Sequence, residues 1–494
     1  MTRWGTKLVA LTTALAALVA AAPAQARGPK PVPHVERSGE RAYIADEHGR
    51  ELLLRGINSN ALVQYPDYFQ QTVPLRRDDF AEMAALGFNF LRLPISWSLL
   101  APSPGEFSED YLGLIERKVK AAERAGMRVV VDFHQDRYNR NLRPGDEADG
   151  APDWATLTDG RPCEESFFLS PCSEAAYDNF WNNTVVAGKP LQDHYRDALL
   201  AVSRRLRGDR KLLGIELMNE PTYGTTTPPA FERTQLWPFE SRMIDALRAD
   251  GERRMIWFGP NLLRDVTDAD SGQPERFSDD PNLVYAPHIY TGTFNSGGVP
   301  ELERSYANAE QEARAYDAAW VDGEWGGGSD PKAEMMRAAK LDLQDQYRVG
   351  SGFWMWKQQE GFYNWQTVEE DGALRDDSFR AQQLSRPHVD WVPGELTATA
   401  AADGTLSASV RGGGGLARLW SGTVVNYGGE TALTKPLVRV YIDGERAKPR
   451  RLTLVRYRTA STGLLGYRVT VEVPRGEHTI ELRPGPLRPN RVRK

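Results

Sequence analysis

The sequence predicts an α/β fold in which a (β/α)8 barrel is followed by a C-terminal β-sandwich. Three observations lead to this prediction. Short apolar runs alternate eight times with stretches of helical apolar spacing, which is the pattern of parallel strands connected by helices. Nearly every apolar run ends in a polar or aromatic side chain. After about Pro387 the helical spacing disappears, and alternating runs separated by Gly-rich turns replace it.

Eight apolar runs supply the expected barrel strands. They span residues 51–58, 89–95, 128–133, 212–220, 254–260, 283–290, 318–325 and 351–356. Amphipathic helices are expected between them, for example at 77–86, 111–125, 192–206 and 238–249. In a barrel of parallel strands the carboxyl ends meet on one face, so the residues that close these runs are expected to line one site.

Seven short runs after the barrel predict the β-sandwich. They span 396–400, 405–410, 417–420, 437–442, 451–457, 467–473 and 478–482. The predicted division of the chain is a signal peptide at 1–26, a catalytic barrel at 27–386 and the sandwich at 387–494. A packing role for the sandwich and a role in binding a glycan or membrane both remain open at this point.

The first 26 residues have the three regions of a secretory signal. Arg3 and Lys7 precede an apolar run at 8–22, and Ala24-Gln25-Ala26 provides a cleavage site. The sequence therefore predicts a secreted protein. The two cysteines of the chain, Cys163 and Cys172, lie close together, and a disulfide between them is expected in an oxidising compartment.

The composition is that of an ordinary globular protein. Of 494 residues, 40% are hydrophobic, which is enough for a large core. A net charge of -6 is small for this length, so a nucleic-acid partner is not expected. We expect a monomer.

Two glutamates stand at strand ends where a chemical role is expected. Glu220 lies in Asn219-Glu220-Pro221 after the fourth run, and Glu324 lies in Asp-Gly-Glu-Trp-Gly at the end of the seventh. A retaining glycosidase needs one protonated and one ionised carboxyl group, about 5 Å apart. Glu216 is the local competitor of Glu220, but it lies within the strand body, where an arginine partner would make it structural.

These residues resemble a known enzyme family. Arg92 in Leu-Arg-Leu-Pro, Asn219-Glu220-Pro221, His288-Ile289-Tyr290, Glu324 and Trp356 are together similar to glycoside hydrolase family 5. The resemblance implies that Glu220 is the general acid/base and that Glu324 is the nucleophile.

The remaining members of the motif have expected roles beside the two glutamates. Tyr290 and Arg92 would hydrogen-bond Glu324 and favour its ionised form. Asn219 would hold the 2-hydroxyl of the sugar, and Trp356 would stack under its ring. His288 is expected to bind substrate, although His288 and Arg92 could each be a satisfied core residue instead.

A narrower resemblance comes from the third strand end. The run at 131–136, which contains His134 and Asp136, is followed by Gly-Ala-Pro-Asp-Trp-Ala at 150–155 and Asn-Phe-Trp-Asn-Asn at 179–183. This pattern resembles the endoglycoceramidase branch of the family, including its endogalactosylceramidase-like relatives. The branch cleaves the β-linkage between a glycan and ceramide, and the likeness implies that His134 and Asp136 bind sugar hydroxyls and that Trp181 lines their subsite.

The lipid side of such a substrate finds weaker support. A ceramide needs apolar surface near the glutamates, and aromatic residues in the loops could supply it or could line a polysaccharide groove. These are Phe167, Phe168, Trp181, Phe362, Tyr363 and Trp365. Transient contact with lipid membranes or micelles is expected for a glycosphingolipid substrate. Endoglycoceramidases tend to have a sugar-contacting lysine after the first strand, whereas residues 58–65 contain none, so the identity of the sugar stays open.

Three functional hypotheses follow. The first is a secreted retaining β-glycosidase acting on glycosphingolipids. The second is an endo-β-glucanase or mannanase acting on polysaccharide, and the third is a non-catalytic carbohydrate-binding protein. No cofactor and no metal are expected, because general acid/base catalysis with a covalent intermediate needs neither.

Overall fold

The computed structural model describes residues 31–67, 69, 71–142, 149–163, 170–269, 274–359, 365–375, 378–426, 435–458 and 463–488. The expected signal peptide lies outside these ranges. Val32–Lys494 form one compact unit. Within the described ranges, none of the helices combines the length and the apolar character that a membrane crossing requires.

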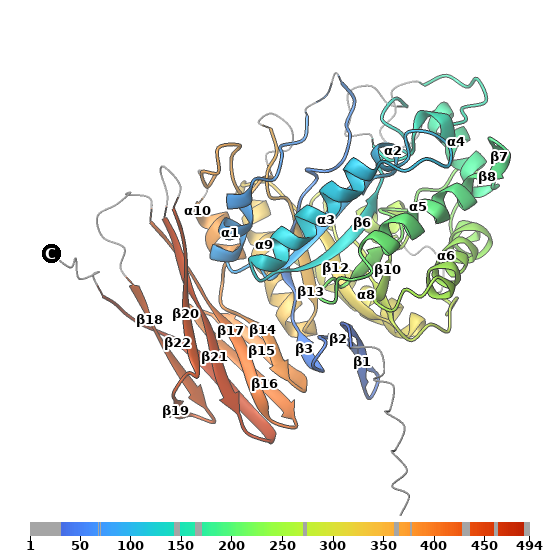
Figure 1. Cartoon of the computed structure of the whole chain (residues 1–494). Coiled ribbons are helices and arrows are strands. Elements are labelled where there is room, and N and C mark those ends of the chain that lie inside the picture. The colour runs from blue at the N-terminus through green and yellow to red at the C-terminus, as the bar shows by residue number, and fades with distance from the viewer. Residues whose placement is uncertain are drawn as a thin grey trace, which may run out of the picture. The chain divides into compact units, whose positions relative to one another are not determined.

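Eight parallel strands close a barrel, as the sequence predicts (Figure 1). In order around the barrel they are β4 (Arg55–Asn58), β5 (Phe90–Ser96), β6 (Arg128–His134), β9 (Gly214–Glu216), β10 (Met255–Phe258), β11 (Leu283–Tyr285), β12 (Ala319–Gly326) and β13 (Gly350–Trp354). The expected first strand at 51–58 is divided, because β3 (Arg50–Leu52) leaves the barrel and pairs with β14 (His388–Pro393).

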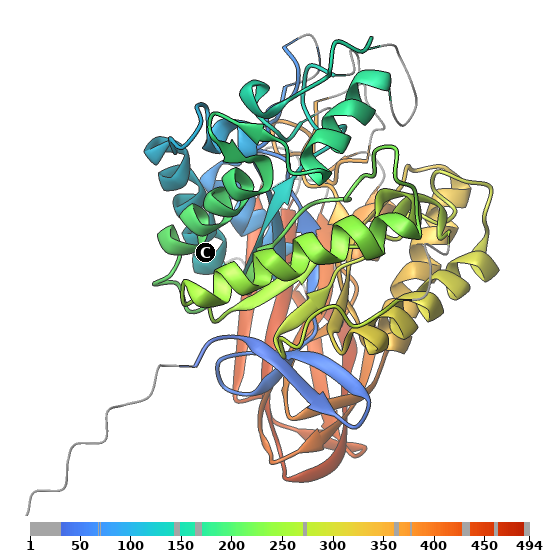
Figure 2. The ribbon, with the colours of Figure 1, turned by 90° about the vertical axis from the view of Figure 1, so that its right-hand side faces the viewer.

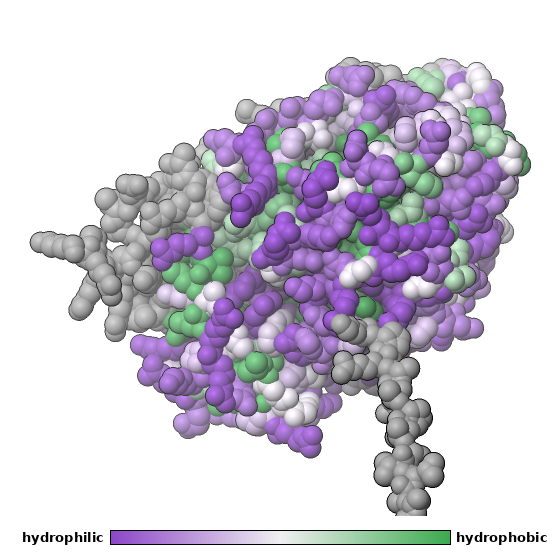
Figure 3. Space-filling model, viewed as in Figure 1, coloured by the Kyte–Doolittle hydropathy of each residue, from purple (hydrophilic) through white to green (hydrophobic). Residues whose placement is uncertain are grey.

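Helices surround the barrel (Figure 2). They are α1 (Arg77–Ala85), α2 (Trp97–Leu100), α3 (Glu109–Arg124), α4 (Pro171–Trp181), α5 (Leu191–Arg205), α6 (Trp237–Ala249), α7 (Leu262–Thr267), α8 (Val299–Tyr316), α9 (Pro331–Tyr347) and α10 (Ser378–Leu384), with η1 (Asp153–Ala155) and η2 (Glu232–Leu236). Their starts follow ordinary rules: Asp330 caps α9 with its side chain, and Pro331 follows at the first helical position. The face seen in Figure 3 is largely hydrophilic, as expected when apolar helix faces turn inward.

The C-terminal part consists of two antiparallel sheets that enclose an apolar core, in agreement with the predicted β-sandwich. One sheet has the order β1 (His34–Ser38), β2 (Arg41–Ala45), β3, β14, β17 (Gly415–Asn426), β21 (Gly463–Val473), β20 (Arg451–Arg458). The other has the order β15 (Glu395–Ala402), β16 (Thr405–Gly412), β22 (Gly476–Arg488), β18 (Lys435–Ile442), β19 (Glu445–Ala447). A two-stranded ribbon, β7 (Val185–Val186) and β8 (Lys189–Pro190), precedes α5. Strands from the start of the chain therefore complete a sheet of the sandwich.

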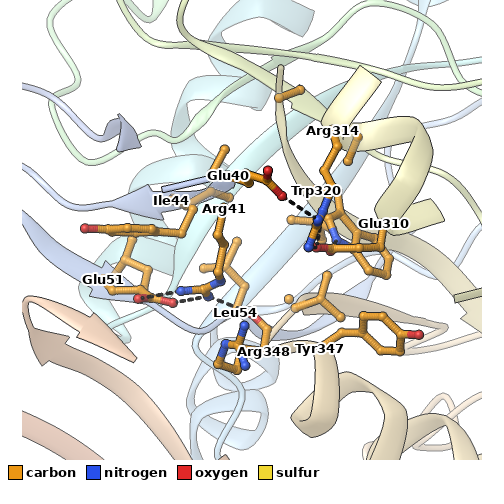
Figure 4. A pocket seen from close by; sticks show the side chains of 18 residues that line it. Glu40, Arg41, Ile44, Glu51, Leu54, Glu310, Arg314, Trp320, Tyr347 and Arg348 are labelled. Carbon is orange, nitrogen blue, oxygen red and sulfur yellow. Dashed lines mark hydrogen bonds and ion pairs between the residues drawn. The ribbon is translucent and has the colours of Figure 1, made fainter. Parts of the chain in front are cut away.

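A hollow lies at the amino ends of β12 and β13, where the N-terminal strands meet the barrel (Figure 4). Its walls carry charges of both signs. Arg41 forms a buried ion pair with Glu51, and the backbone carbonyl of Arg348 accepts a hydrogen bond from Arg41 (3.3 Å). Arg348 in turn donates to the carbonyl oxygen of Thr397 on β15 (3.1 Å). These contacts join the barrel to the sandwich at the end opposite the carboxyl ends of the strands.

Candidate active site

The polar residues at the carboxyl ends of the strands converge as the fold predicts. Arg92 lies on β5 and Glu324 on β12, while Glu220 follows β9 and His288 and Tyr290 follow β11. Backbone pairing fixes two of these positions, because His288 and Glu324 form an isolated parallel bridge.

Arg92 is the centre of this group and is fully buried. Its guanidinium donates two hydrogen bonds to Glu216 (2.7 and 2.8 Å) and one to Glu324 (3.0 Å). It also donates to the side-chain oxygen of Asn219 (2.9 Å) and lies 3.1 Å from a carboxylate oxygen of Asp132. The paired contact with Glu216 is the structural role expected for that carboxylate. Arg92 therefore orients both Glu324, the nucleophile candidate, and the side-chain amide of Asn219.

The carboxyl groups of Glu220 and Glu324 lie close together. One oxygen of each lies within 4.8 Å of the other, and a ring nitrogen of His288 lies within the same distance of both. Tyr290 donates from its hydroxyl to Glu324 (2.6 Å), and Nδ1 of His288 hydrogen-bonds with Glu220 (2.9 Å). The separation matches the roughly 5 Å of retaining glycosidases and is shorter than the 6.5 to 9.5 Å of inverting ones.

The two carboxyl groups have different electrostatic surroundings. Burial, together with the negative charge of Asp136, raises the pKa of Glu220 to about 8. Burial also raises the pKa of Glu324, but Arg92 opposes this rise, and the hydrogen bond from Tyr290 favours the ionised form. Burial lowers the pKa of His288 to about 4, so this imidazole is neutral at pH 7. Burial and Asp136 thus favour the proton on Glu220, whereas the contacts from Arg92 and Tyr290 favour the ionised form of Glu324.

The backbone at Glu220 adopts the left-handed conformation, with φ at 38°. This conformation is strained for a residue with a side chain. The side-chain N–H groups of Gln135 donate to the carbonyl oxygens of Asn219 and Glu220, both at 2.8 Å. The hydroxyl of Tyr177 donates to the side-chain oxygen of Gln135 (2.6 Å). Sequence reasoning missed Gln135, because its position between His134 and Asp136 carries no sign of a bond to the backbone of another strand.

His134 and Asp136 lie beside the carboxyl pair, as the sequence predicts. His134 hydrogen-bonds with Asp132 through Nδ1 (2.7 Å) and with Asp136 through Nε2 (3.1 Å). These carboxylates outweigh burial and raise the pKa of His134 well above its usual value. The imidazole stacks on the indole of Trp354, with ring centroids 5.6 Å apart and planes 9° from parallel.

Trp356 does not have the position that its predicted role requires. Its side chain is fully buried, its indole N–H donates to Asp79 on α1 (3.2 Å), and its ring packs edge-on against Phe88. A ring enclosed in this way cannot stack under a sugar. Because β13 ends at Trp354, the indole that faces His134 belongs to Trp354, two residues earlier.

The structure also shows the positions of Trp181 and of the two cysteines. Trp181 is largely buried, donates to the carbonyl oxygen of Thr222 (2.8 Å), and lines a small apolar cavity together with His134 and Met218. The expected disulfide between Cys163 and Cys172 is present and confirms that prediction. The aromatic residues expected on the lipid side at 167, 168, 362 and 363 lie outside the described residues.

The donor atoms of Glu220, His288 and Glu324 are close enough together to hold a small cation. Hydrogen bonds within the protein already engage them, since His288 contacts Glu220 while Arg92 and Tyr290 contact Glu324. The arrangement is therefore explained without an ion, and the absence of a cofactor remains a prediction.

Comparison with known proteins identifies the class. The model of the cellulase family, glycosyl hydrolase family 5, matches residues 45–360. With its barrel and paired glutamates, the chain belongs to glycoside hydrolase family 5.

Within that family it is similar to endoglycoceramidase I of Rhodococcus hoagii (strain 103S), which is 27% identical over 332 residues, or 61% of this chain and 64% of the relative. An endoglycoceramidase of Cyanea nozakii is 24% identical over 44% of this chain and 49% of the relative. The chain thus spans about half to two thirds of these relatives.

Solved structures extend the likeness to nearly the whole chain. A crystal structure of an endogalactoceramidase is 27% identical, with a TM-score of 0.74, and the match covers 91% of this chain and 99% of that one. Endo-glycoceramidase II from Rhodococcus sp., solved as a lactosyl-enzyme intermediate, is 25% identical with a TM-score of 0.72, covering 90% and 100%. These matches agree with the predicted resemblance to the endoglycoceramidase branch.

Proposed function

We propose that this protein hydrolyses the β-linkage between the glycan and the ceramide of glycosphingolipids, with retention at the anomeric carbon. The separation of the carboxyl oxygens of Glu220 and Glu324, within 4.8 Å, carries the mechanistic part of the proposal. The choice of substrate rests on the endoglycoceramidase and endogalactoceramidase relatives.

In the first step, the carboxylate of Glu324 attacks the anomeric carbon, and the bond from that carbon to the ceramide oxygen breaks. Glu220 gives its proton to the departing oxygen, which needs it to leave as an alcohol. A glycosyl ester on Glu324 results. The Rhodococcus relative, solved as a lactosyl-enzyme intermediate, supports a covalent intermediate. In the second step, water attacks the anomeric carbon, Glu220 accepts a proton, and Glu324 is released.

The surrounding residues would hold the sugar. The side-chain oxygen of Asn219 accepts from Arg92, and its amide donates to the carbonyl oxygen of Gln135 (3.0 Å), so the amide is fixed for contact with the 2-hydroxyl. Trp354 offers an aromatic face at the end of β13. His134 and Asp136 would bind hydroxyls of the sugar in the subsite before the scissile bond.

The deciding experiment compares purified wild-type protein on glucosyl-, galactosyl- and lactosylceramide with its action on a soluble β-glucan, using mass spectrometry to identify products. Release of intact ceramide and glycan is expected, and the Glu324→Gln protein should release neither. Reducing ends from the glucan without ceramide release would instead establish the polysaccharide hydrolase. Binding of glycolipid without any cleavage would establish the carbohydrate-binding alternative.

We further propose that the protein is exported and acts as a monomer in transient contact with lipid membranes or micelles. The disulfide supports export, because disulfides persist in oxidising compartments. The mass of the protein recovered outside the cell should correspond to cleavage after Ala26, and light scattering should give the mass of a single chain.

A further inference from the structure

The segment His288–Tyr290 carries a partner for each catalytic carboxyl group. His288 contacts Glu220, and Tyr290 donates to Glu324. The segment follows β11, which ends at Tyr285, so a regular ladder of strand hydrogen bonds does not position it. Bonds from neighbouring elements must set its place.

Three of those bonds come from elements of the active-site face. The backbone N–H of His288 donates to the side chain of Asp265 (2.8 Å), and that of Tyr290 donates to the backbone carbonyl of the same residue (3.3 Å). Between them, the N–H of Ile289 donates to the carbonyl oxygen of Glu324 (3.1 Å). The carbonyl of Ile289 points the other way and accepts a hydrogen bond from Nζ of Lys340 on α9 (2.6 Å).

Lys340 is an unusual residue to find at this position. Its side chain is 1% exposed, and its ammonium lies 5.9 Å from the ring centre of Tyr290 and 5.7 Å from that of Trp325. Burial lowers its pKa to about 8, an effect that the charge of Asp322 opposes. Burying an ammonium costs several kcal/mol in general, and an apolar side chain of similar length would avoid that cost. The ammonium therefore calls for a functional explanation.

We propose that Lys340 is a positioning residue, which fixes the carbonyl of Ile289 and thereby sets His288 and Tyr290 against the two catalytic carboxyl groups. The inference rests on the proposed glycosidase function, since it assigns a residue to that reaction. Lys340 acts through the backbone, because its hydrogen bond goes to Ile289 and not to Glu220 or Glu324.

A cavity beside Lys340 makes the proposal testable by chemical rescue. The cavity has a volume of about 290 Å³, and its lining includes Lys340, Met336, the glycines at 326–328 and Lys332. Lys332 is solvent-exposed, so the cavity extends to the surface. A small ammonium ion can enter it and take the place of Nζ when the lysine side chain is shortened.

The experiment uses Lys340→Met and Lys340→Ala, with Lys332→Met as a matched control on the same helix and cavity. We expect kcat of Lys340→Met to fall about 100-fold with KM changed less than about twofold, because displacement of a catalytic group by about 1 Å has that effect. Its unfolding temperature should equal or exceed that of the wild type. Methylammonium should raise the kcat of Lys340→Ala at least tenfold. Tetramethylammonium has no N–H and should not raise it.

A readout independent of turnover accompanies the kinetics. The His288 ring is titrated by NMR, where the buried imidazole of the wild type should show a pKa of about 4. In Lys340→Met this pKa should move towards the ordinary value, and in Lys332→Met it should not. An unchanged His288 titration in Lys340→Met would overturn the proposal even if no glycoside is cleaved. A kcat of Lys340→Met within twofold of the control, or equal rescue by both ammonium ions, would do so as well. A wild type that cleaves no glycoside contradicts only the proposed function.

Discussion

Gln135 holds the backbone of Glu220 in its left-handed conformation. The amide donates to the carbonyl oxygens of Asn219 and Glu220, so the position of the proposed acid/base residue depends on the side chain that follows β6. These hydrogen bonds, with the bond from Tyr177 that fixes the amide of Gln135, stabilise the strained backbone at Glu220.

Gln135→Leu is expected to lower stability and activity together. The buried carbonyl oxygen of Asn219 loses its donor, while that of Glu220 keeps the hydroxyl of Thr222 (2.9 Å), so the loss is about 1 to 3 kcal/mol of unfolding free energy. We expect kcat to fall about 100-fold as Glu220 moves. The matched control is Gln192→Leu, because the buried amide of Gln192 also donates to two consecutive carbonyl oxygens, those of Phe180 and Trp181. Denaturant unfolding should show similar losses for both proteins, and equal kcat losses would contradict the role of Gln135.

Tyr290→Phe removes the hydroxyl that donates to Glu324 while keeping the ring. The ionised form of Glu324 loses a hydrogen bond, so its pKa should rise and the acid limb of the kcat/KM profile should move to higher pH. We expect kcat to fall about 10-fold or more. Tyr306→Phe is the control, because Tyr306 makes an equally short bond (2.6 Å) to the buried Asp322. If both variants shift the acid limb equally, the bond from Tyr290 has no specific role.

The alkaline limb of activity should report Glu220. The reaction needs its proton, which is lost as pH rises through about 8, so kcat/KM should fall tenfold per pH unit above that value. Glu220→Gln should abolish this limb and should affect substrates with good leaving groups least. Because an unfolded glutamate has a pKa of about 4.3, the raised folded value reduces stability as pH rises from about 4.3 to about 8. The unfolding temperature of Glu220→Gln at pH 7 should therefore exceed that of the wild type.

The two tryptophans at the end of the eighth strand should respond differently. Trp354→Ala should raise KM for the glycolipid about 10-fold, because it removes the aromatic surface beside His134. Trp356→Phe should leave KM unchanged and cost about 1 kcal/mol of stability, because it removes the hydrogen bond to Asp79. A rise in KM for Trp356→Phe alone would restore the stacking role first predicted for that residue.

Sequence patterns predict those parts of the site that follow from strand alternation. Arg92 lies within β5, and Glu324 lies on β12 where the register with β13 shifts between Asp322 and Trp325. For both, a polar residue in or at the end of an apolar run is enough to predict a place in the barrel. Trp354 and Trp356 are two residues apart, so a continuous strand would place both side chains on the same face. The strand ends at Trp354, and the chain then turns towards α1, which alternation cannot foresee.

Local sequence patterns also do not predict contacts between segments that lie far apart in the chain. The bond from Lys340 to Ile289 joins a helix to a loop, and neither residue has a motif that indicates the other. The same holds for the N-terminal strands, whose pairing with β14 brings Leu52 opposite Trp391. Hydrophobic periodicity identifies such strands one at a time but does not name their partners.

The sheet that combines β3 with β14 affects how the chain can fold during synthesis. The ribosome releases β3 early, but the strand that covers its edge emerges only after the last barrel strand. Until then, β3 presents unpaired backbone groups that could join another chain. A protein that ends at residue 386 would lack β14, so this edge of β3 would stay without its partner strand.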